Sequence, residues 1–347
     1  HIEEVSILTT PPKLNAVVAG ISRGETVSQA VMFARDLVNE PPSFTTPTHL
    51  ADVAGKLVKG HANMSCEVFG PKEMKTLGME AILGIARGSD EEPRFIHLSY
   101  KGGGGKTVCL VGKGITFDTG GLSLKDSKNM ETMKLDMAGA AAILGVFSVL
   151  PILKPNINVV GLIAATENMP GPKAIKPGDV VAAMNGKTIE ILNTDAEGRV
   201  VLADALSYAG AKVKSDAIVD LATLTGACMV ALGEEIAGMF TDDVTLAEEL
   251  ERAATDSGEH IWSMPLARQY KELVKSDVAD VKNISGTKYG GAINGALFLA
   301  EFAPLSVPWA HLDIAGPAFA EKDAPLTPKG GTGFGVRMLL QWLLQEK

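Results

Sequence analysis

Residues 108–121 read VCLVGKGITFDTGG, an apolar run that leads into glycines and isolated charges. The first four residues are typical of a buried β-strand. Lys113 and Asp118 follow in otherwise apolar surroundings, where a charge is costly unless it is paired or bound to a metal. The glycines allow the backbone to turn tightly and approach a ligand closely. Lys113 is therefore expected at the carboxyl end of a strand, the edge where open α/β sheets place their ligands.

Strands and helices alternate on both sides of this segment. Further strands are expected at residues 66–69, 94–100, 158–166, 217–221 and 309–314. Helices are expected at residues 26–37, 47–59, 130–150, 200–211 and 292–303, and after Asp243 and Gly335. This alternation predicts an α/β fold, with a mixed, largely parallel central sheet covered by helices on both faces in a three-layer sandwich.

Two glycine-containing segments predict turns. Asn185-Gly186 lies between residues 180–184 and 188–192 and predicts a tight hairpin. The glycine tract at residues 102–105 is expected to be the hairpin loop that joins the strands at 94–100 and 108–111. Residues 1–30 have little periodic pattern and are expected to be a linker or the remnant of a missing N-terminal domain, and residues 31–347 one large domain.

Composition limits the class of protein. The 347 residues carry a formal net charge of −9, which disfavours nucleic acid as the main partner. Three widely spaced cysteines argue against a disulfide framework. No apolar run is expected to reach the roughly 20 residues of a membrane-spanning helix, and no secretory signal pattern is evident, so the expected location is cytoplasmic, with an organelle such as a plastid left open.

A second charged segment follows the predicted strand at residues 188–192. It reads NTDAEGR over residues 193–199. In an extended conformation Asp195, Glu197 and Arg199 would point to one side. A salt-bridged turn that caps the next helix is the alternative for this cluster alone. When this segment is considered together with Lys113 and Asp118, however, the converging carboxylates favour a divalent cation between them, because a cation offsets their mutual repulsion.

The ligand types indicate the chemistry of such a site. Oxygen-rich ligation suits Mg, Mn or Zn, and carboxylates that bridge two ions are typical of hydrolytic centres. Two ions in such a centre polarise a carbonyl group and lower the pKa of water to roughly 7. The residues therefore predict a two-metal hydrolase.

Several segments together resemble the leucyl aminopeptidase family, the M17 cytosol aminopeptidases. The segments are VGKGITFDTGG from Val111, MKLDMAGAA from Met133, NTDAEGR from Asn193, LATLTGA from Leu221 and HLDIAGP from His311. The resemblance covers the chain from about residue 35 to its end. It implies that residues 31–347 are a metallopeptidase catalytic domain, that family members carry a further N-terminal domain, and that they assemble as hexamers.

The resemblance also implies roles for individual residues. One metal would be held by Lys113, Asp118, Asp136 and Glu197, and a second by Asp118, Asp195 and Glu197. Lys125 would stabilise the oxyanion, and Arg199 would hold a bicarbonate ion that acts as general base. The substrate pocket would be lined by Met133, Asn193, Thr223, Gly226, Ala315 and Ala318.

Two other functions stay open at this point. A two-metal phosphohydrolase could use a similar carboxylate cluster, although Arg199 is the one arginine near either charged segment. A non-catalytic binding or scaffold protein of the same fold is the second alternative. Peptide substrates and a homo-hexamer are the expected partners, and no membrane is expected.

Overall fold

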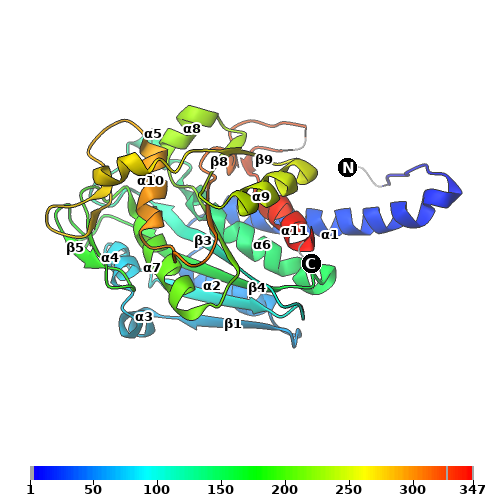
Figure 1. Ribbon diagram of the computed structural model, residues 1–347, viewed down its shortest axis with the longest axis horizontal. Helices are drawn as coiled ribbons and strands as arrows, with labels where there is room; N and C mark the ends of the chain where they lie inside the picture. Colours follow the sequence, from blue (N-terminus) through cyan, green and yellow to red (C-terminus); the bar gives the residue numbers. More distant parts are fainter. Residues whose placement is uncertain (1–3, 326, 346–347) are drawn as a thin grey trace.

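The computed structural model describes residues 4–325 and 327–345. An eight-stranded mixed sheet forms the centre of the molecule (Figure 1). In spatial order its strands are β1 (Met64–Phe69), β2 (Arg94–Tyr100), β4 (Asn158–Asn168), β3 (Thr107–Asp118), β7 (Ala217–Ala222), β11 (Trp309–Asp313), β8 (Ile236–Thr241) and β9 (His260–Ser263). The middle strands β4, β3, β7 and β11 are parallel, whereas β1, β2 and β8 pair antiparallel with their inner neighbours. The predicted mixed, largely parallel sheet is confirmed.

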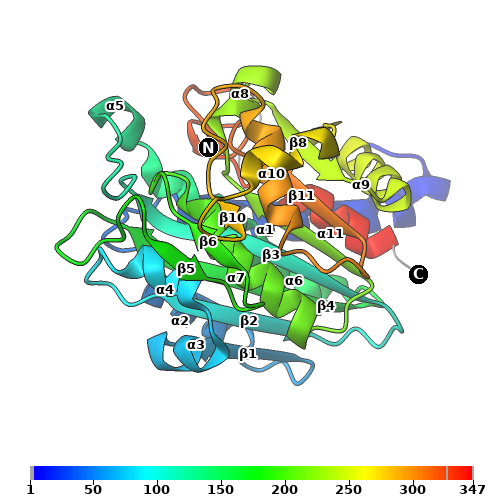
Figure 2. The same cartoon turned by 60° about the vertical axis from the view of Figure 1, so that its left-hand side comes forward.

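Helices cover both faces of this sheet (Figures 1 and 2). One face packs against α1 (Leu14–Asn39), α2 (Pro47–Leu57), α6 (Ala138–Leu153), α9 (Val244–Ser257) and α11 (Val336–Gln345). The other packs against α3 (Pro71–Leu77), α4 (Glu80–Ala86), α7 (Glu197–Lys212) and α10 (Gly291–Ala300). The side chains of β3 contribute to the hydrophobic cores on both faces of the sheet, because successive side chains of a strand point to opposite faces. Val108 and Leu110 pack in the core with α1 and α6, and Cys109 and Val111 pack in the core with α4 and α7.

The remaining elements are short. They are the helices α5 (Ser127–Met130) and α8 (Gly226–Leu232), the 3₁₀ helices η1 (Pro11–Lys13), η2 (Met133–Met137) and η3 (Arg268–Val274), and the strands β5 (Val180–Ala182), β6 (Thr188–Glu190), β10 (Val281–Lys282), β12 (Phe319–Ala320) and β13 (Gly330–Gly331). Strands β5 and β6 pair antiparallel around Asn185-Gly186, which confirms that hairpin.

The N-terminal helix is longer than predicted. We expected it to begin at residue 26, but α1 begins at Leu14, and its first turns project beyond the body of the molecule (Figure 1). The predicted linker is therefore helical from Leu14 onward. The first half of this helix contains several apolar residues, but Leu14, Val18 and Ile21 are exposed, so no buried stripe marks it as a packed helix. The division into domains at residue 30 stays a prediction.

The predicted hairpin between β2 and β3 is wrong. Strand β4 lies between them in the sheet and pairs antiparallel with β2 and parallel with β3. The glycine tract instead packs against the chain just before β4: a Cβ atom on Gly102 would lie 2.1 Å from the carbonyl oxygen of Ile157, and one on Gly104 would lie 1.8 Å from that of Asn156. The glycines therefore serve a close approach of two backbones rather than a tight turn.

One apolar stretch is longer than the sequence analysis allowed. Residues Met133–Leu153, which form η2 and α6, are long and apolar enough to cross a membrane by length and composition, and 78% of the window is buried inside the structure. Most of α6 packs against the sheet and α1. This stretch is therefore a core element of the fold.

Candidate metal centre

The charged residues predicted from the sequence meet at the carboxyl ends of the parallel strands. Lys113 lies in β3, one residue past the last β3 residue that pairs with β7, and Asp118 ends the strand. Asp136 lies in η2, Asp195 in the loop after β6, and Glu197 is the first residue of α7. Three stretches distant in sequence, residues 113–118, residue 136 and residues 195–197, thus deliver ionisable groups to one edge of the sheet, where open α/β sheets bind their ligands.

Lys113 is buried between two carboxylates. Its Nζ atom lies 2.8 Å from Asp136 Oδ1 and 2.9 Å from Glu197 Oε1, and it also donates a hydrogen bond to the backbone oxygen of Thr223. Burial by itself would lower the pKa of Lys113, but the carboxylates of Asp136, Glu197 and Asp118 outweigh burial and raise that pKa above its ordinary range.

Lys125 forms the second ion-paired group. Its Nζ atom lies 2.9 Å from Asp118 Oδ2 and also contacts Asp195 Oδ1. Its side chain is 15% exposed, compared with 3% for Lys113, so Lys125 lies at the mouth of the cluster and Lys113 at its base. Burial lowers the pKa of Lys125, whereas the Asp118 and Glu197 carboxylates raise it, and the net direction is upward.

Carboxylates outnumber the ammonium groups in this cluster. Ligand oxygens of Asp118, Asp195 and Glu197 all lie within 4.8 Å of one another. Burial raises the pKa values of Asp136, Asp195 and Glu197, because ionised carboxylates are poorly solvated there. In addition, Asp136 Oδ2 and Glu197 Oε2 are buried and lack a hydrogen-bond partner among the described residues. Unpartnered acceptors beside convergent negative charges fit divalent cations.

Small residues make room for this arrangement. A Cβ atom on Gly198 would lie 2.7 Å from both Cε and Nζ of Lys113, so the lysine reaches Glu197 across a position that only glycine leaves open. Gly120 and Gly121 have positive φ angles of 83° and 61° in the loop after Asp118. Glycine tolerates this backbone conformation at little cost, and the loop can fold back toward Asp195.

The NTDAEGR segment differs from its predicted conformation. Glu197 and Arg199 lie in the first turn of α7 rather than in an extended strand. Residues two apart on a helix do not face each other. Arg199 donates through Nη1 to the backbone oxygen of Asn283, at 2.9 Å. Asp195 and Glu197 converge because a turn separates them. Burial lowers the pKa of Arg199 to about 10, and its Nε atom lacks a partner among the described residues.

Two of the residues predicted to form a substrate pocket, Thr223 and Asn193, have hydrogen bonds to the charged cluster. Thr223 contacts it directly, since its Oγ1 atom donates a 2.7 Å hydrogen bond to Asp136 Oδ1. Asn193 accepts from the backbone nitrogen of Asp195. Met133 begins η2, three residues before Asp136, and Gly226 begins α8 three residues after Thr223. Ala318 is 1% exposed and packs in the first core, and Ala315 is half-buried next to it.

Two buried asparagines were not predicted as part of the site. Asn168, the last residue of β4, donates to Asp118 Oδ1, and Asn283 donates to the backbone oxygen of Asn193. Neither residue stands in the charged segments from which the site was deduced. For Asn168, its position at the end of the strand-like run of β4 is the signal that could have identified it, whereas Asn283 follows the two-residue strand β10 of the separate three-stranded sheet.

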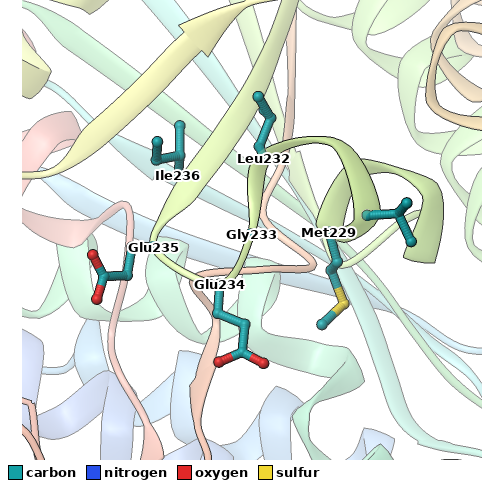
Figure 3. Close-up of a pocket in the computed structure, with 7 residues that line it drawn as sticks. Met229, Leu232, Gly233, Glu234, Glu235 and Ile236 are labelled. Atoms are coloured by element: carbon teal, nitrogen blue, oxygen red, sulfur yellow. The ribbon is translucent and has the colours of Figure 1, made fainter.

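A separate hollow of about 620 Å³ lies at the end of α8 (Figure 3). It is lined by Met229, Val230, Leu232, Gly233, Glu234, Glu235 and Ile236, none of which belongs to the charged cluster. The carboxylates of Glu234 and Glu235 point in different directions in Figure 3 and do not converge on a common point.

Residues 32–340 match the sequence model of a family described as "Cytosol aminopeptidase family, catalytic domain". The chain is 52% identical over 331 residues to a probable cytosol aminopeptidase of Synechococcus sp. (strain JA-3-3Ab), an alignment that covers 94% of this chain and 64% of the relative. It is 48% identical over 344 residues to a probable cytosol aminopeptidase of Gloeobacter violaceus, with 96% of this chain and 68% of the relative covered. The chain thus spans less than two thirds of the length of the Synechococcus relative.

A solved structure has the same fold. The bottromycin maturation enzyme BotP in complex with Mn superposes with a TM-score of 0.91 and is 41% identical, covering 97% of this chain and 73% of that chain.

Proposed function

The chain belongs to the cytosol aminopeptidase family, and from this membership we propose that it is a two-metal aminopeptidase that removes the N-terminal residue, leucine or a similar one, from peptides. The observation that carries the proposal is the convergence of ligand oxygens of Asp118, Asp195 and Glu197 within 4.8 Å of one another, beside buried carboxylate oxygens that lack a hydrogen-bond partner in the described part of the chain. Carboxylates arranged in this way require cations to offset their repulsion.

Two sets of residues would hold the metals. The deeper ion would be held by Lys113, Asp118, Asp136 and Glu197, and the outer ion by Asp118, Asp195 and Glu197. Zinc, manganese and magnesium all suit such ligands, and manganese is supported by the BotP complex. When bound, the ions supply Lewis acidity that polarises the peptide carbonyl and lowers the pKa of a water molecule. A lysine can ligate a metal only as a neutral amine, so Lys113 must lose its proton when the deeper ion binds.

Lys125 and Arg199 would act on the reacting groups. The half-buried ammonium of Lys125 presents a preorganised positive charge where the oxyanion of the tetrahedral intermediate develops. Arg199 would hold a bicarbonate ion that accepts the proton of the attacking water. The unpartnered Nε atom of Arg199, which is buried at the same edge of the sheet, supports this role.

The substrate side chain would enter between Met133, Thr223, Gly226, Ala315 and Ala318, with Asn193 near the amino end. The hydrogen bond from Thr223 to Asp136 supports the place of Thr223 in this pocket. An unprotonated α-amino group would ligate a metal, which accounts for selectivity for N-terminal residues. We further propose a cytoplasmic homo-hexamer as the assembled form, a proposal that rests on the family alone.

Release of free leucine from an unblocked peptide tests this function. The purified chain with Mn²⁺ should release leucine, and a chelator or N-acetylation of the peptide should abolish release. A phosphohydrolase would instead cleave a phosphoester and ignore acetylation of the peptide. A binding protein would bind the peptide and release nothing, and either result would contradict the proposal.

A further inference from the structure

Asn168 connects the two segments that carry the outer carboxylates. It ends β4, is 1% exposed, and is the register partner of Asp118 on β3. The pairing of β3 with β4 is interrupted between Ile115 and Asp118, and this irregularity brings the Asp118 side chain toward Asn168. The Asn168 Nδ2 atom donates to Asp118 Oδ1 at 2.7 Å and to the backbone oxygen of Thr194 at 3.0 Å.

These hydrogen bonds distinguish the two oxygens of Asp118. The Oδ1 atom accepts from Asn168 and also from the backbone nitrogen of Gly120 at 2.9 Å. A carboxylate oxygen offers about two lone-pair sites, so two donors saturate Oδ1. The Oδ2 atom lies 2.9 Å from Lys125 Nζ, which also contacts Asp195. A cation at the cluster would therefore meet Oδ2.

The side-chain amide of Asn168 also donates a hydrogen bond to the segment that carries Asp195. Thr194 directly precedes Asp195, and its backbone oxygen is held by Asn168. The side chain of Thr194 in turn donates to the backbone oxygen of Gly120 and accepts from the backbone nitrogen of Ser123. The loop after Asp118 and the loop that carries Asp195 are thus joined through the described contacts of Asn168 and Thr194.

We propose that Asn168 is a positioning residue of the metal centre: it directs Asp118 to ligate metal through Oδ2 and fixes the separation between Asp118 and Asp195. This inference rests on the proposed function. Residues that orient metal ligands in this way contribute about 10- to 100-fold in metal affinity or activity.

The test measures Mn²⁺ binding to the full chain by titration calorimetry, together with thermal unfolding of the metal-free protein. Asn168→Ala removes both donors, and Asn168→Leu removes them while retaining most of the side-chain volume. Thr116→Val is the matched control, because Thr116 is buried in β3, donates to the Thr166 backbone oxygen across the same strand pair, and has no hydrogen bond to a predicted ligand. Both Asn168 variants should bind Mn²⁺ about 10- to 100-fold more weakly than the wild type, and the control should bind it with unchanged affinity.

The outcomes distinguish failure of the positioning role from failure of the proposed function on which it rests. If the wild type binds Mn²⁺ and releases leucine but the Asn168 variants bind Mn²⁺ with unchanged affinity, the positioning role is wrong and the function stands. If neither Asn168 variant folds while Thr116→Val does, Asn168 is structural and the inference also fails. A wild type that binds no Mn²⁺ and releases no leucine would contradict the proposed function itself.

Discussion

Lys113 and Asp136 are joined by a buried contact of 2.8 Å between Nζ and Oδ1 at the base of the charged cluster. The side chains are 3% and 5% exposed, so solvent contributes little to screening them. The same geometry suits an ammonium paired with a carboxylate and, with a divalent cation among the carboxylates, a neutral amine that acts as a ligand. The two arrangements differ in their response to removal of the lysine nitrogen.

Lys113→Met tests the ligand role. If the amine ligates the deeper ion, the variant should bind divalent metal at least about tenfold more weakly, and metal affinity of the wild type should fall as pH drops because protons compete for the same nitrogen. If Lys113 is only a charge partner, loss of its positive charge beside Asp136 and Glu197 should preserve or strengthen binding. Calorimetry at two pH values decides between these roles.

Lys125→Ala should reduce kcat by about 10²- to 10³-fold, the usual loss when one oxyanion-stabilising group is removed. Metal content should remain at the wild-type level, because the proposed interaction strengthens only in the transition state. Lys128→Ala, in the exposed helix α5, is the control and should retain full activity. Metal analysis alongside kinetics is required, since equal losses of metal and activity would make Lys125 structural.

Gly198→Ala should weaken the deeper metal site without unfolding the protein. The added methyl group would lie 2.7 Å from Lys113 Nζ, so the lysine must move from its place between Asp136 and Glu197. We expect a loss of about tenfold or more in metal affinity if Lys113 is a ligand. Gly55→Ala in α2 is the control because, apart from its chain neighbours and the backbone of its own helix, no described heavy atom lies within 4 Å of the added methyl group. Unchanged metal affinity in Gly198→Ala would show that the lysine position is not critical.

Asp204→Asn should change how stability depends on pH. Asp204 is fully buried in α7, accepts from the backbone nitrogens of Ile82 and Met184, and has a pKa raised by burial from 3.8 to about 7. The folded state therefore keeps this proton to a higher pH than the unfolded state, and the stability it contributes is complete below 3.8 and lost as pH rises through about 7. The variant should be less stable at pH 4 by about 1–3 kcal/mol, and its deficit should shrink toward pH 8.

Chemical denaturation at several pH values measures this effect. Asp280→Asn is a control of opposite sign, because hydrogen bonds from the Thr188 backbone nitrogen and hydroxyl lower the pKa of Asp280. The stability that Asp280 contributes is present at neutral pH and lost in acid, so its variant should lose its deficit as pH falls. A pH-independent deficit for Asp204→Asn would contradict the raised pKa.

The sequence by itself determined the fold class and most elements of the sheet, because β3 and β4 contain apolar runs at residues 108–111 and 159–165 and the helices carry clear stops such as the prolines after Asn39. It also identified Lys113, Asp118, Asp136, Asp195 and Glu197, since charged residues in apolar or glycine-rich segments are costly without a partner. The tertiary structure brings these five residues to one edge of the sheet. Whether they bind two metals stays a prediction.

Only the tertiary structure decided the remaining features, because they depend on which segments become neighbours. The order of β2, β4 and β3 follows from strand pairing between residues far apart in sequence. The glycine tract at residues 102–105 was wrongly predicted to be a hairpin loop, because a close approach of two backbones and a tight turn both favour glycine. The helical start of α7 at Glu197 likewise replaced the extended conformation that alternation suggested. Asn168 became visible only when β3 and β4 paired, since its role comes from hydrogen bonds to Asp118 and Thr194, 50 and 26 residues away.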